Sequence, residues 1–449
     1  MQGKTTRARG AALLAAALLA APCAAVASLP KPAGRAAAPA KPALRGRELR
    51  VRIDDRWVDL TRWRAAHPAG EHWIDLFQGQ DATDVFHAFH SADTRKRMMP
   101  RLPSVQAVDE AAVLDAACAP VTQLTRDFRA WREQLEAEGW WERDALAEAT
   151  SFGLWALAVA AGSTFAWSGV PVVSSVFAVL TLATANTMAG WLGHDYIHGK
   201  DKFCDFMRPF GGLAAGLSST WWSDKHNLHH AVTNEVGTDE DLMVDPALWL
   251  WPPNEQADKP WRQWQHRYVA LPFSLLFHIW RFDSLKVAWT RREDGDVLRK
   301  ELLPLVAHYG LFWAVCACSL PTMAAVVSLS SLFTAIIVTV SHQTEELYFE
   351  RQPDWVAAQL GSTRDSVSSN PFSEWIWGGM NYQVEHHLFP TMPRSKYPRL
   401  APLLRAWCEE RGVAYRVDAE LDILKRNLAM YKTIAQAPVD PAAPFAKAA

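Results

Sequence analysis

This sequence lacks the C-x-x-C motif, although it contains six cysteines. Their spacing does not fit a disulfide framework, and it indicates free thiols in a reducing compartment. A basic excess is also missing, since the formal net charge of the 449 residues is −2. Without a field of positive charge, nucleic acid is not an expected partner. Charged side chains make up 21% of the chain and hydrophobic ones 49%, which leaves room for long apolar segments.

Acidic residues are absent from residues 1–47. Within this stretch Lys4, Arg7 and Arg9 precede an apolar run and a small-residue cleavage pattern, as in a signal peptide. The residues that follow are rich in Ala, Pro, Lys and Arg, as plastid transit peptides are. The stretch resembles the bipartite presequence of an alga and favours a plastid membrane. The alternative is an uncleaved tail on a protein of the endoplasmic reticulum membrane.

The first folded unit is expected at residues 48–118. Val51 and Ile53, followed by Trp57 and Val58, predict two short strands around an Asp-Asp turn. A helical segment follows these strands, so the unit is expected to be of the α+β class.

Two motifs in this unit each contain a histidine. His67 opens the tetrapeptide H-P-A-G, and His90 ends the segment D-A-T-D-V-F-H-A-F-H. Their order and separation resemble those of the cytochrome b5 family. That resemblance implies that His67 and His90 are the axial ligands of a heme b, which then carries electrons because its iron keeps no open position. Ala69 stands where the family has its first glycine, and it would strain the turn if that position required a positive φ.

The same resemblance implies an apolar pocket around the heme. Its walls are expected to come from Leu76, Phe77, Phe86 and Phe89. Two further histidines, His72 and His87, lie near the motifs, and surface positions are the expected account of both.

Four uncharged apolar stretches predict membrane spans, each about long enough to cross a hydrocarbon core of ~30 Å. They form two hairpins, with Pro171 and Pro321 at the breaks, which leaves both termini and the middle segment on one side. The hairpin turns carry no Lys or Arg while the middle segment carries many, so that side is the cytosolic one or its equivalent. The predicted spans are residues 152–169, 172–192, 302–319 and 323–341.

Two shorter apolar features surround these spans. Phe128, Trp131 and Leu135 have helical spacing with charges between them, which predicts an amphipathic helix on the membrane surface after the first unit. Residues 268–280 are apolar but short, which indicates a re-entrant or interfacial helix.

Clusters of histidine follow the predicted spans, all on one side of the membrane. The stretch WWSDKHNLHH places three imidazoles at i, i+3 and i+4, on one face of a helix. Burying such a stripe without partners costs free energy, whereas neutral imidazole is the commonest ligand of transition metals. The pattern therefore predicts a metal site. The candidate residues are His194 and His198, then His226, His229 and His230, then His342, and finally Gln383, His386 and His387.

The order H-x-x-x-H, H-x-x-H-H and Q-x-x-H-H around two hydrophobic hairpins resembles the membrane fatty-acid desaturases over residues 119–430. The Gln-containing third cluster together with a fused cytochrome b5 unit resembles the front-end members of that family. The resemblance implies two iron ions held by the eight histidines named above, which with Gln383 are then the catalytic residues. Oxygen activation for an unactivated acyl chain requires a redox metal, which zinc is not. Asp195, Asp224 and Glu385, beside these histidines, are candidates for orienting them, with plain helix-surface charge as the equal alternative.

The expected protein is therefore an α-helical integral membrane protein with four spans in two hairpins, helices on the cytosolic side and an N-terminal α+β cytochrome b5-like domain. The expected domains are a presequence (1–47), the heme domain (48–118) and the di-iron desaturase domain (119–449). Expected partners are an acyl-lipid or acyl-CoA substrate, O2, membrane lipid, and cytochrome b5 reductase or a plastid electron donor. Alternatives are a sphingoid long-chain-base desaturase, a lipid hydroxylase, and a heme electron carrier without lipid chemistry.

Overall fold

The computed structural model describes residues 49–104, 121–170 and 172–443, so the expected presequence lies outside the described residues. The first unit begins with the two predicted strands, β1 (Arg50–Ile53) and β2 (Arg56–Asp59), which pair antiparallel. Helices α3 (His72–Leu76), α4 (Thr83–Phe89) and α5 (Ala92–Met98) follow, with short 3-10 turns at Arg64–Ala66 and Met99–Arg101.

The predicted amphipathic helix is α7 (Gln123–Ala137), capped by the hydroxyl of Thr122. Its apolar face contacts protein, because Phe128 and Leu135 are buried and the ring of Trp131 stacks on that of Trp407 at 5.6 Å. The expectation that this face lies on the membrane surface is wrong. Helical spacing reveals an apolar face but does not reveal what covers it.

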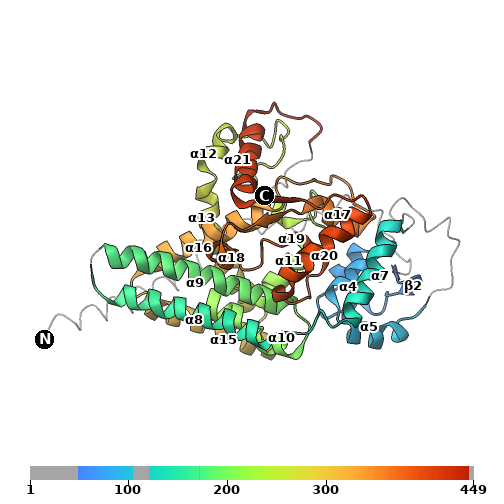
Figure 1. Ribbon diagram of the computed structural model, residues 1–449, viewed down its shortest axis with the longest axis horizontal. Helices are drawn as coiled ribbons and strands as arrows, with labels where there is room; N and C mark the ends of the chain where they lie inside the picture. Colours follow the sequence, from blue (N-terminus) through green and yellow to red (C-terminus); the bar gives the residue numbers. More distant parts are fainter. Residues whose placement is uncertain (1–48, 105–120, 171, 444–449) are drawn as a thin grey trace. The chain divides into compact units, whose positions relative to one another are not determined.

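Three described helices are long and apolar enough to cross a membrane: α8 (Ala145–Trp167), residues Ser175–His198 of α9 (Val173–His198), and α16 (Leu320–Val340). They lie side by side in Figure 1. In the apolar 18-residue stretch of α8 only 6% of the residues are buried in protein, against 61% in the corresponding stretch of α9. Helix α8 is therefore peripheral, while α9 is central and carries buried functional residues at its end.

The remaining predicted span, residues 302–319, contains the shorter helix α15 (Leu303–Val315), which continues from a π-helical turn, η7 (Leu298–Leu302). The chain turns after α15 through Ala317 and Cys318, both with positive φ. The predicted short helix at 268–280 is longer than expected, because α13 continues from Ala270 to Thr290 and packs on α16.

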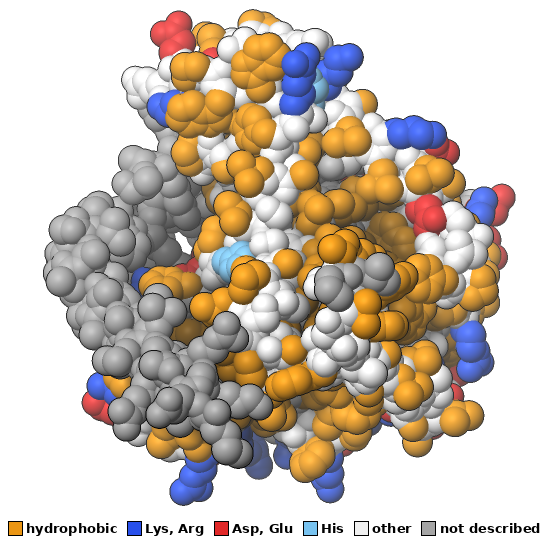
Figure 2. All heavy atoms as spheres, turned by 90° about the vertical axis from the view of Figure 1, so that its left-hand side faces the viewer, with side chains coloured by type: hydrophobic (Ala, Val, Ile, Leu, Met, Phe, Trp, Pro, Cys, Tyr) orange, Lys and Arg blue, Asp and Glu red, His pale blue; other side chains and the backbone are white. Residues whose placement is uncertain are grey.

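Large apolar side chains are exposed along these helices. Figure 2 shows hydrophobic side chains spread over much of one face. Leu157 on α8 is 67% exposed and Leu271 on α13 is 62% exposed. Exposing so much apolar surface to water costs free energy, whereas the same surface is favourable in contact with lipid.

The C-terminal part of the chain folds against the helices that hold the histidines. Two short strands from it, β3 and β4, pair in parallel. The elements here and in the middle segment are α10 (Lys202–Met207), η4 (Gly211–Ala215), α11 (Ser219–Ala231), η5 (Glu240–Leu242), η6 (Arg262–Trp264), α12 (Gln265–Tyr268), α14 (Gly295–Val297), α17 (Trp355–Ser362), β3 (Asp365–Val367), α18 (Pro371–Trp377), α19 (Gln383–Leu388), η8 (Arg394–Lys396), α20 (Tyr397–Glu410), β4 (Val417–Ala419) and α21 (Glu420–Gln436).

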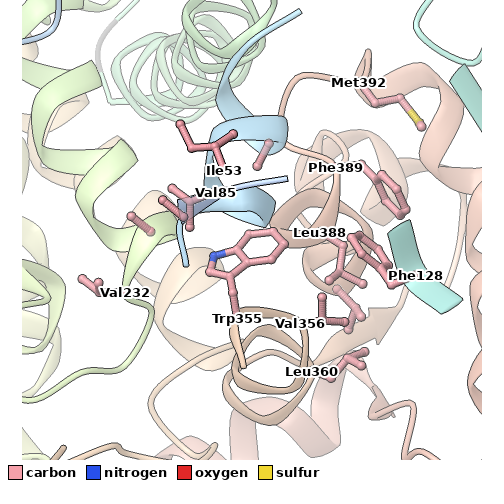
Figure 3. Close-up of a cluster of buried hydrophobic side chains, with 14 of the residues drawn as sticks. Ile53, Val85, Phe128, Val232, Trp355, Val356, Leu360, Leu388, Phe389 and Met392 are labelled. Carbon is pink, nitrogen blue, oxygen red and sulfur yellow. The ribbon is translucent and has the colours of Figure 1, made fainter. Parts of the chain in front are cut away.

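One hydrophobic core joins the first unit to the rest of the described chain. Ile53 and Val85 belong to the same buried cluster as Val232, Trp355 and Leu388 (Figure 3). Residues that share a core of this kind are held by packing. The first unit is therefore docked on the helices that carry the histidine clusters.

Candidate metal centre and heme pocket

Helix α11 presents the middle histidine cluster. It begins after Ser218, whose hydroxyl accepts a hydrogen bond from the backbone N–H of Trp221. On this helix His226 and His230 lie one turn apart, and their Nε2 atoms are 3.1 Å apart. The predicted helical face is therefore present.

All eight predicted histidines gather in two groups, buried except for the half-buried His226, and within each group the ligand nitrogens lie within 4.8 Å of one another. Gln383, on α19, lines the cavity described below and belongs to neither group. The first group contains His194, His198, His226, His230 and His386, and the second contains His229, His342 and His387.

The nitrogens of the first group fit a shared cation. Nε2 of His194 lies 2.7 Å from Nε2 of His226, too close for two lone pairs unless a proton or a cation lies between them. With metal–nitrogen bonds of about 2 Å, two ligands at right angles on one ion lie about 3 Å apart. Both ring nitrogens of His198 and Nε2 of His386 are buried without a hydrogen-bond partner. A metal ion would satisfy these nitrogens, which otherwise cost free energy.

The second group is oriented through the Nδ1 atoms of its histidines. His229 Nδ1 donates to Asp239 at 2.8 Å, His387 Nδ1 to Gln359 at 2.9 Å, and His342 Nδ1 to the backbone oxygen of Ser362 at 3.0 Å. These bonds leave each Nε2 with its lone pair. The second group therefore also fits a metal ion.

The acidic neighbours that were candidates for orienting the histidines do not do so. Asp195 pairs with Arg143 at 2.6 Å, Asp224 bonds to His72 at 2.8 Å, and Glu385 accepts from Tyr415 at 2.9 Å. Adjacent residues on a helix point in different directions, so a carboxylate next to a ligand faces away from the ligand stripe.

The true orienting groups are distant in sequence from the histidines they support. Asp239 lies ten residues after His229, and Gln359 lies 28 residues before His387. Tyr397 is a further one, since its hydroxyl lies 3.3 Å from Nδ1 of His386 and donates to the Met392 carbonyl. No helical spacing relates these residues, so sequence reasoning missed them.

Burial controls the protonation of the site. It lowers the pKa of His342 to about 3 and holds the pKa of His230 and His387 well below the usual value. For His229, burial also acts to lower the pKa, but the Asp239 carboxylate outweighs it and the pKa is raised. The first three are neutral near pH 7, as metal ligands must be, and Asp239 makes His229 the more basic donor.

A cavity of about 390 Å³ adjoins both histidine groups. Its other walls are mainly apolar and come from α9, α11, α13, α16 and the segment after η5 that contains Leu248. They include Trp191, Leu248, Phe273, Leu276, Trp280 and Val338. Six of the eight histidines line it: His194, His226, His229, His342, His386 and His387. The arrangement suits an apolar chain held against a metal centre.

The first unit contains a second cavity, of about 300 Å³, lined by His67 and His90. Nδ1 of His67 donates to the Gly70 carbonyl and Nδ1 of His90 to the Phe86 carbonyl, each at 3.0 Å. Both Nε2 lone pairs are therefore free. With metal–nitrogen bonds of about 2 Å, two imidazoles facing one ion have ring centres about 6 Å apart, and these centres are 6.3 Å apart.

Other features of this cavity also fit a heme. Burial lowers the pKa of His90 to about 4, with the charge of Lys200 acting in the same direction, so the imidazole is neutral. Phe77, Phe86 and Phe89 line the cavity as expected, but Leu76 does not.

The turn that contains Ala69 is not strained by this residue, because Ala69 has no positive φ and the left-handed position is Gly70 (φ 105°). The expected non-ligands His72 and His87 do not line the cavity and instead contact Asp224 and Asp54.

Comparison with known proteins places these features in a family context. The model of the family described as "Fatty acid desaturase" matches residues 171–419, and that of the "Cytochrome b5-like Heme/Steroid binding domain" matches residues 48–106. Fatty acid desaturase 3 of Bos taurus is 32% identical, over 83% of this chain and 87% of the relative. Delta(6)-fatty-acid desaturase fat-3 of Caenorhabditis elegans is 27% identical over 86% and 96%, and acyl-lipid 8-desaturase of Rebecca salina 27% over 85% and 90%.

Proposed function

This chain belongs to the fatty acid desaturase family, and on that premise we propose how its own residues carry out the reaction. It is an oxidoreductase that performs oxygen-dependent front-end desaturation of an unsaturated acyl chain, with a fused cytochrome b5-like domain. In such a reaction the new double bond forms between an existing one and the carboxyl end. The observation that carries the assignment is the apolar cavity of about 390 Å³ lined by six of the clustered histidines.

The two histidine groups are the proposed holders of two iron ions. The group of five would hold one ion and the group of three the other. When bound, these ions supply the redox chemistry that activates O2 toward an unactivated C–H bond. Asp239 and Gln359 keep His229 and His387 in the tautomer that presents Nε2 to the ion.

The cavity walls select and position the substrate. Trp191, Phe273 and Trp280 offer apolar contacts to an acyl chain and exclude water from the reacting carbons. Gln383 contributes a neutral amide to the wall beside His386 and His387, so it can position the chain without adding charge. An acyl-lipid and an acyl-CoA place the same apolar chain in this cavity, so either is a proposed substrate.

Electrons are proposed to enter through a heme b held by His67 and His90. Helix α11 lies between the two sites: Asn227 lines the heme cavity while His226 belongs to the five-histidine group. The ring of Phe89, from the heme cavity, lies 6.5 Å from that of His230. The electron donor is proposed to be cytochrome b5 reductase or a plastid donor, and it would approach the first unit.

We further propose that α15, with η7, completes a fourth membrane crossing and a second hairpin. The helix alone is too short, but the contiguous helical run starts at Gly295 and its Arg299 and Lys300 can reach the interface. Both hairpin turns then lie on the side opposite the heme domain, in a plastid or endoplasmic reticulum membrane.

Native Cys318 provides a test of this topology. It is exposed in the turn after α15, whereas Cys204, Cys316 and Cys408 are buried. In sealed vesicles from a chain lacking Cys23 and Cys118, a membrane-impermeant maleimide is expected to label Cys318 from one side only.

An added Asp55→Cys, on the fully exposed turn of the heme unit, is expected to be labelled only from the opposite side. Cys318→Ser supplies the unlabelled background. Labelling of both cysteines from the same side would contradict the second hairpin.

The proposed reaction is tested by expressing the full chain in yeast fed with unsaturated fatty acids. New double bonds on the carboxyl side of an existing one are expected in the fatty acids. His229→Ala is expected to abolish them, while His266→Ala, a histidine outside both groups, leaves them unchanged. New double bonds in sphingoid bases, hydroxylated products, or no change would contradict the proposal.

A further inference from the structure

The heme cavity is not lined by the first unit alone. Most of its lining residues lie between Val51 and Thr94, but two come from the desaturase part of the chain, Lys200 and Asn227. Lys200 follows the end of α9, and Asn227 lies on α11. The pocket is therefore completed by α11 and by the segment after α9, and these two helices also present the first and middle histidine clusters.

The outer face of α11 explains why Asn227 reaches the heme cavity. Asp224, Asn227, Leu228 and Ala231 follow helical spacing, and they lie toward the first unit. Asp224 bonds to His72 of that unit at 2.8 Å, and Leu228 and Ala231 share its buried cluster (Figure 3 shows neighbouring members). A packed interface thus fixes α11, with Asn227, beside the cavity, and Lys200 closely follows α9, which packs on α11.

Charge at this cavity is unbalanced. Among the described residues that line it, Lys200 is the one cation, and no Asp or Glu lines it. The other polar lining groups besides the two histidines are Ser91, Thr94 and Asn227. The Lys200 side chain is solvent-accessible, but neighbouring protein surrounds it closely enough that burial, with the charge of Arg208, lowers the pKa of its ammonium to about 8. Within the described part of the chain this ammonium makes no hydrogen bond and no ion pair. Asp205 acts on it without pairing with it, so Lys200 has no paired anion among the described residues.

A heme b brings two propionate carboxylates to its pocket, and an ammonium group pairs with a carboxylate. We propose that Lys200 binds a heme propionate, so that the heme is held jointly by the first unit and the desaturase part. This inference rests on the proposed heme binding by His67 and His90. A positive charge at the propionate also disfavours the ferric heme, which carries one more positive charge than the ferrous heme, and so it raises the reduction potential.

The test uses the purified full chain reconstituted with heme. Lys200→Gln is expected to speed heme transfer to an excess of apomyoglobin by about 2- to 5-fold, as for loss of one exposed ion pair. It is also expected to shift the midpoint potential to lower values. Lys200→Arg is expected to restore both, and Lys202→Gln, an exposed lysine that does not line the cavity, to change neither.

Heme dimethyl ester, which lacks free carboxylates, supplies the decisive comparison. With this heme the Lys200→Gln and unchanged chains are expected to lose heme to apomyoglobin at the same rate. An equal effect of Lys200→Gln on the transfer rate of both hemes, or no effect with native heme, would overturn the role of Lys200 while leaving heme binding intact. A wild-type chain that takes up no heme would overturn the proposed heme site and this inference together.

Discussion

Replacing Asp239 with asparagine is expected to weaken iron binding without unfolding the chain. The Asp239 carboxylate is fully buried and accepts from Nδ1 of His229 at 2.8 Å and from the backbone N–H of Asn234 at 2.9 Å. Asparagine has nearly the same shape, so it can keep an acceptor oxygen at the place of Oδ2. Its amide nitrogen then replaces Oδ1, which accepts from the backbone N–H of Asp241 at 3.0 Å. It lacks the charge, and loss of such a partner typically lowers metal affinity or activity about 10- to 100-fold.

The direction of this effect follows from the pKa of His229. Burial acts to lower that pKa, and the Asp239 carboxylate raises it above the usual value, so the carboxylate makes the imidazole more basic. With the neutral amide of asparagine at position 239, the imidazole of His229 is less basic and donates its Nε2 lone pair to a metal cation more weakly. A 10- to 100-fold loss of affinity corresponds to about 1.4–2.8 kcal/mol. The free energy of unfolding should fall by about 1–3 kcal/mol, because a charged hydrogen bond becomes a neutral one and the backbone N–H of Asp241 loses its acceptor.

The assay is the iron content of the purified chain after equilibration with graded Fe²⁺, with thermal unfolding measured on the same samples. Asp224→Asn is the matched control, since Asp224 also neighbours the histidine cluster but its side chain is 51% exposed and bonds to His72. It is expected to keep its iron and to lose less than about 1 kcal/mol of stability. Equal iron loss in both variants, or loss in Asp224→Asn alone, would refute the assigned orientation of His229.

Three further changes test other parts of the account. His67→Ala or His90→Ala in the full chain should remove the six-coordinate heme spectrum. His87→Ala should keep it, because His87 does not line the heme cavity. An unchanged spectrum in His67→Ala or His90→Ala would contradict the assignment of these histidines as heme ligands. Trp355→Ala should cost about 3–5 kcal/mol of unfolding free energy, since the side chain is buried in the shared core and donates to the His230 carbonyl. Phe206→Ala, at a side chain 79% exposed, should cost far less, and comparable losses would contradict the shared core. Val338→Trp, in the wall of the larger cavity, should reduce desaturation of the longest acyl chains with iron and heme content unchanged; product analysis showing no change would place the substrate elsewhere.

Local patterns were enough to predict which histidines gather. On α11 the i, i+3, i+4 spacing places His226, His229 and His230 on one face, and the ends of apolar helices bring His198 and His342 to the same region. The strand pair β1–β2 was likewise predicted from the local alternation of apolar and polar residues. These predictions depended on periodicities that the sequence carries directly.

Other features depended on which surfaces pack together, which periodicity does not contain. His229 joins His342 and His387 rather than its helix neighbour His226, because the third cluster and the end of α16 approach from that side. Sequence adjacency suggested Asp195 as an orienting group, but it pairs with Arg143. The surface helix α7 proved to be covered by Trp407 of α20. Each difference arises from a contact between segments far apart in the chain.

The central claim is that the eight histidines hold two metal ions beside the acyl cavity. Anomalous scattering measured at the iron edge from the heme-loaded full chain tests it most directly. The account predicts three iron peaks: one between His67 and His90, one within the group of His194, His198, His226, His230 and His386, and one within the group of His229, His342 and His387. A single peak shared by all eight histidines, or no peak in either group, would contradict it.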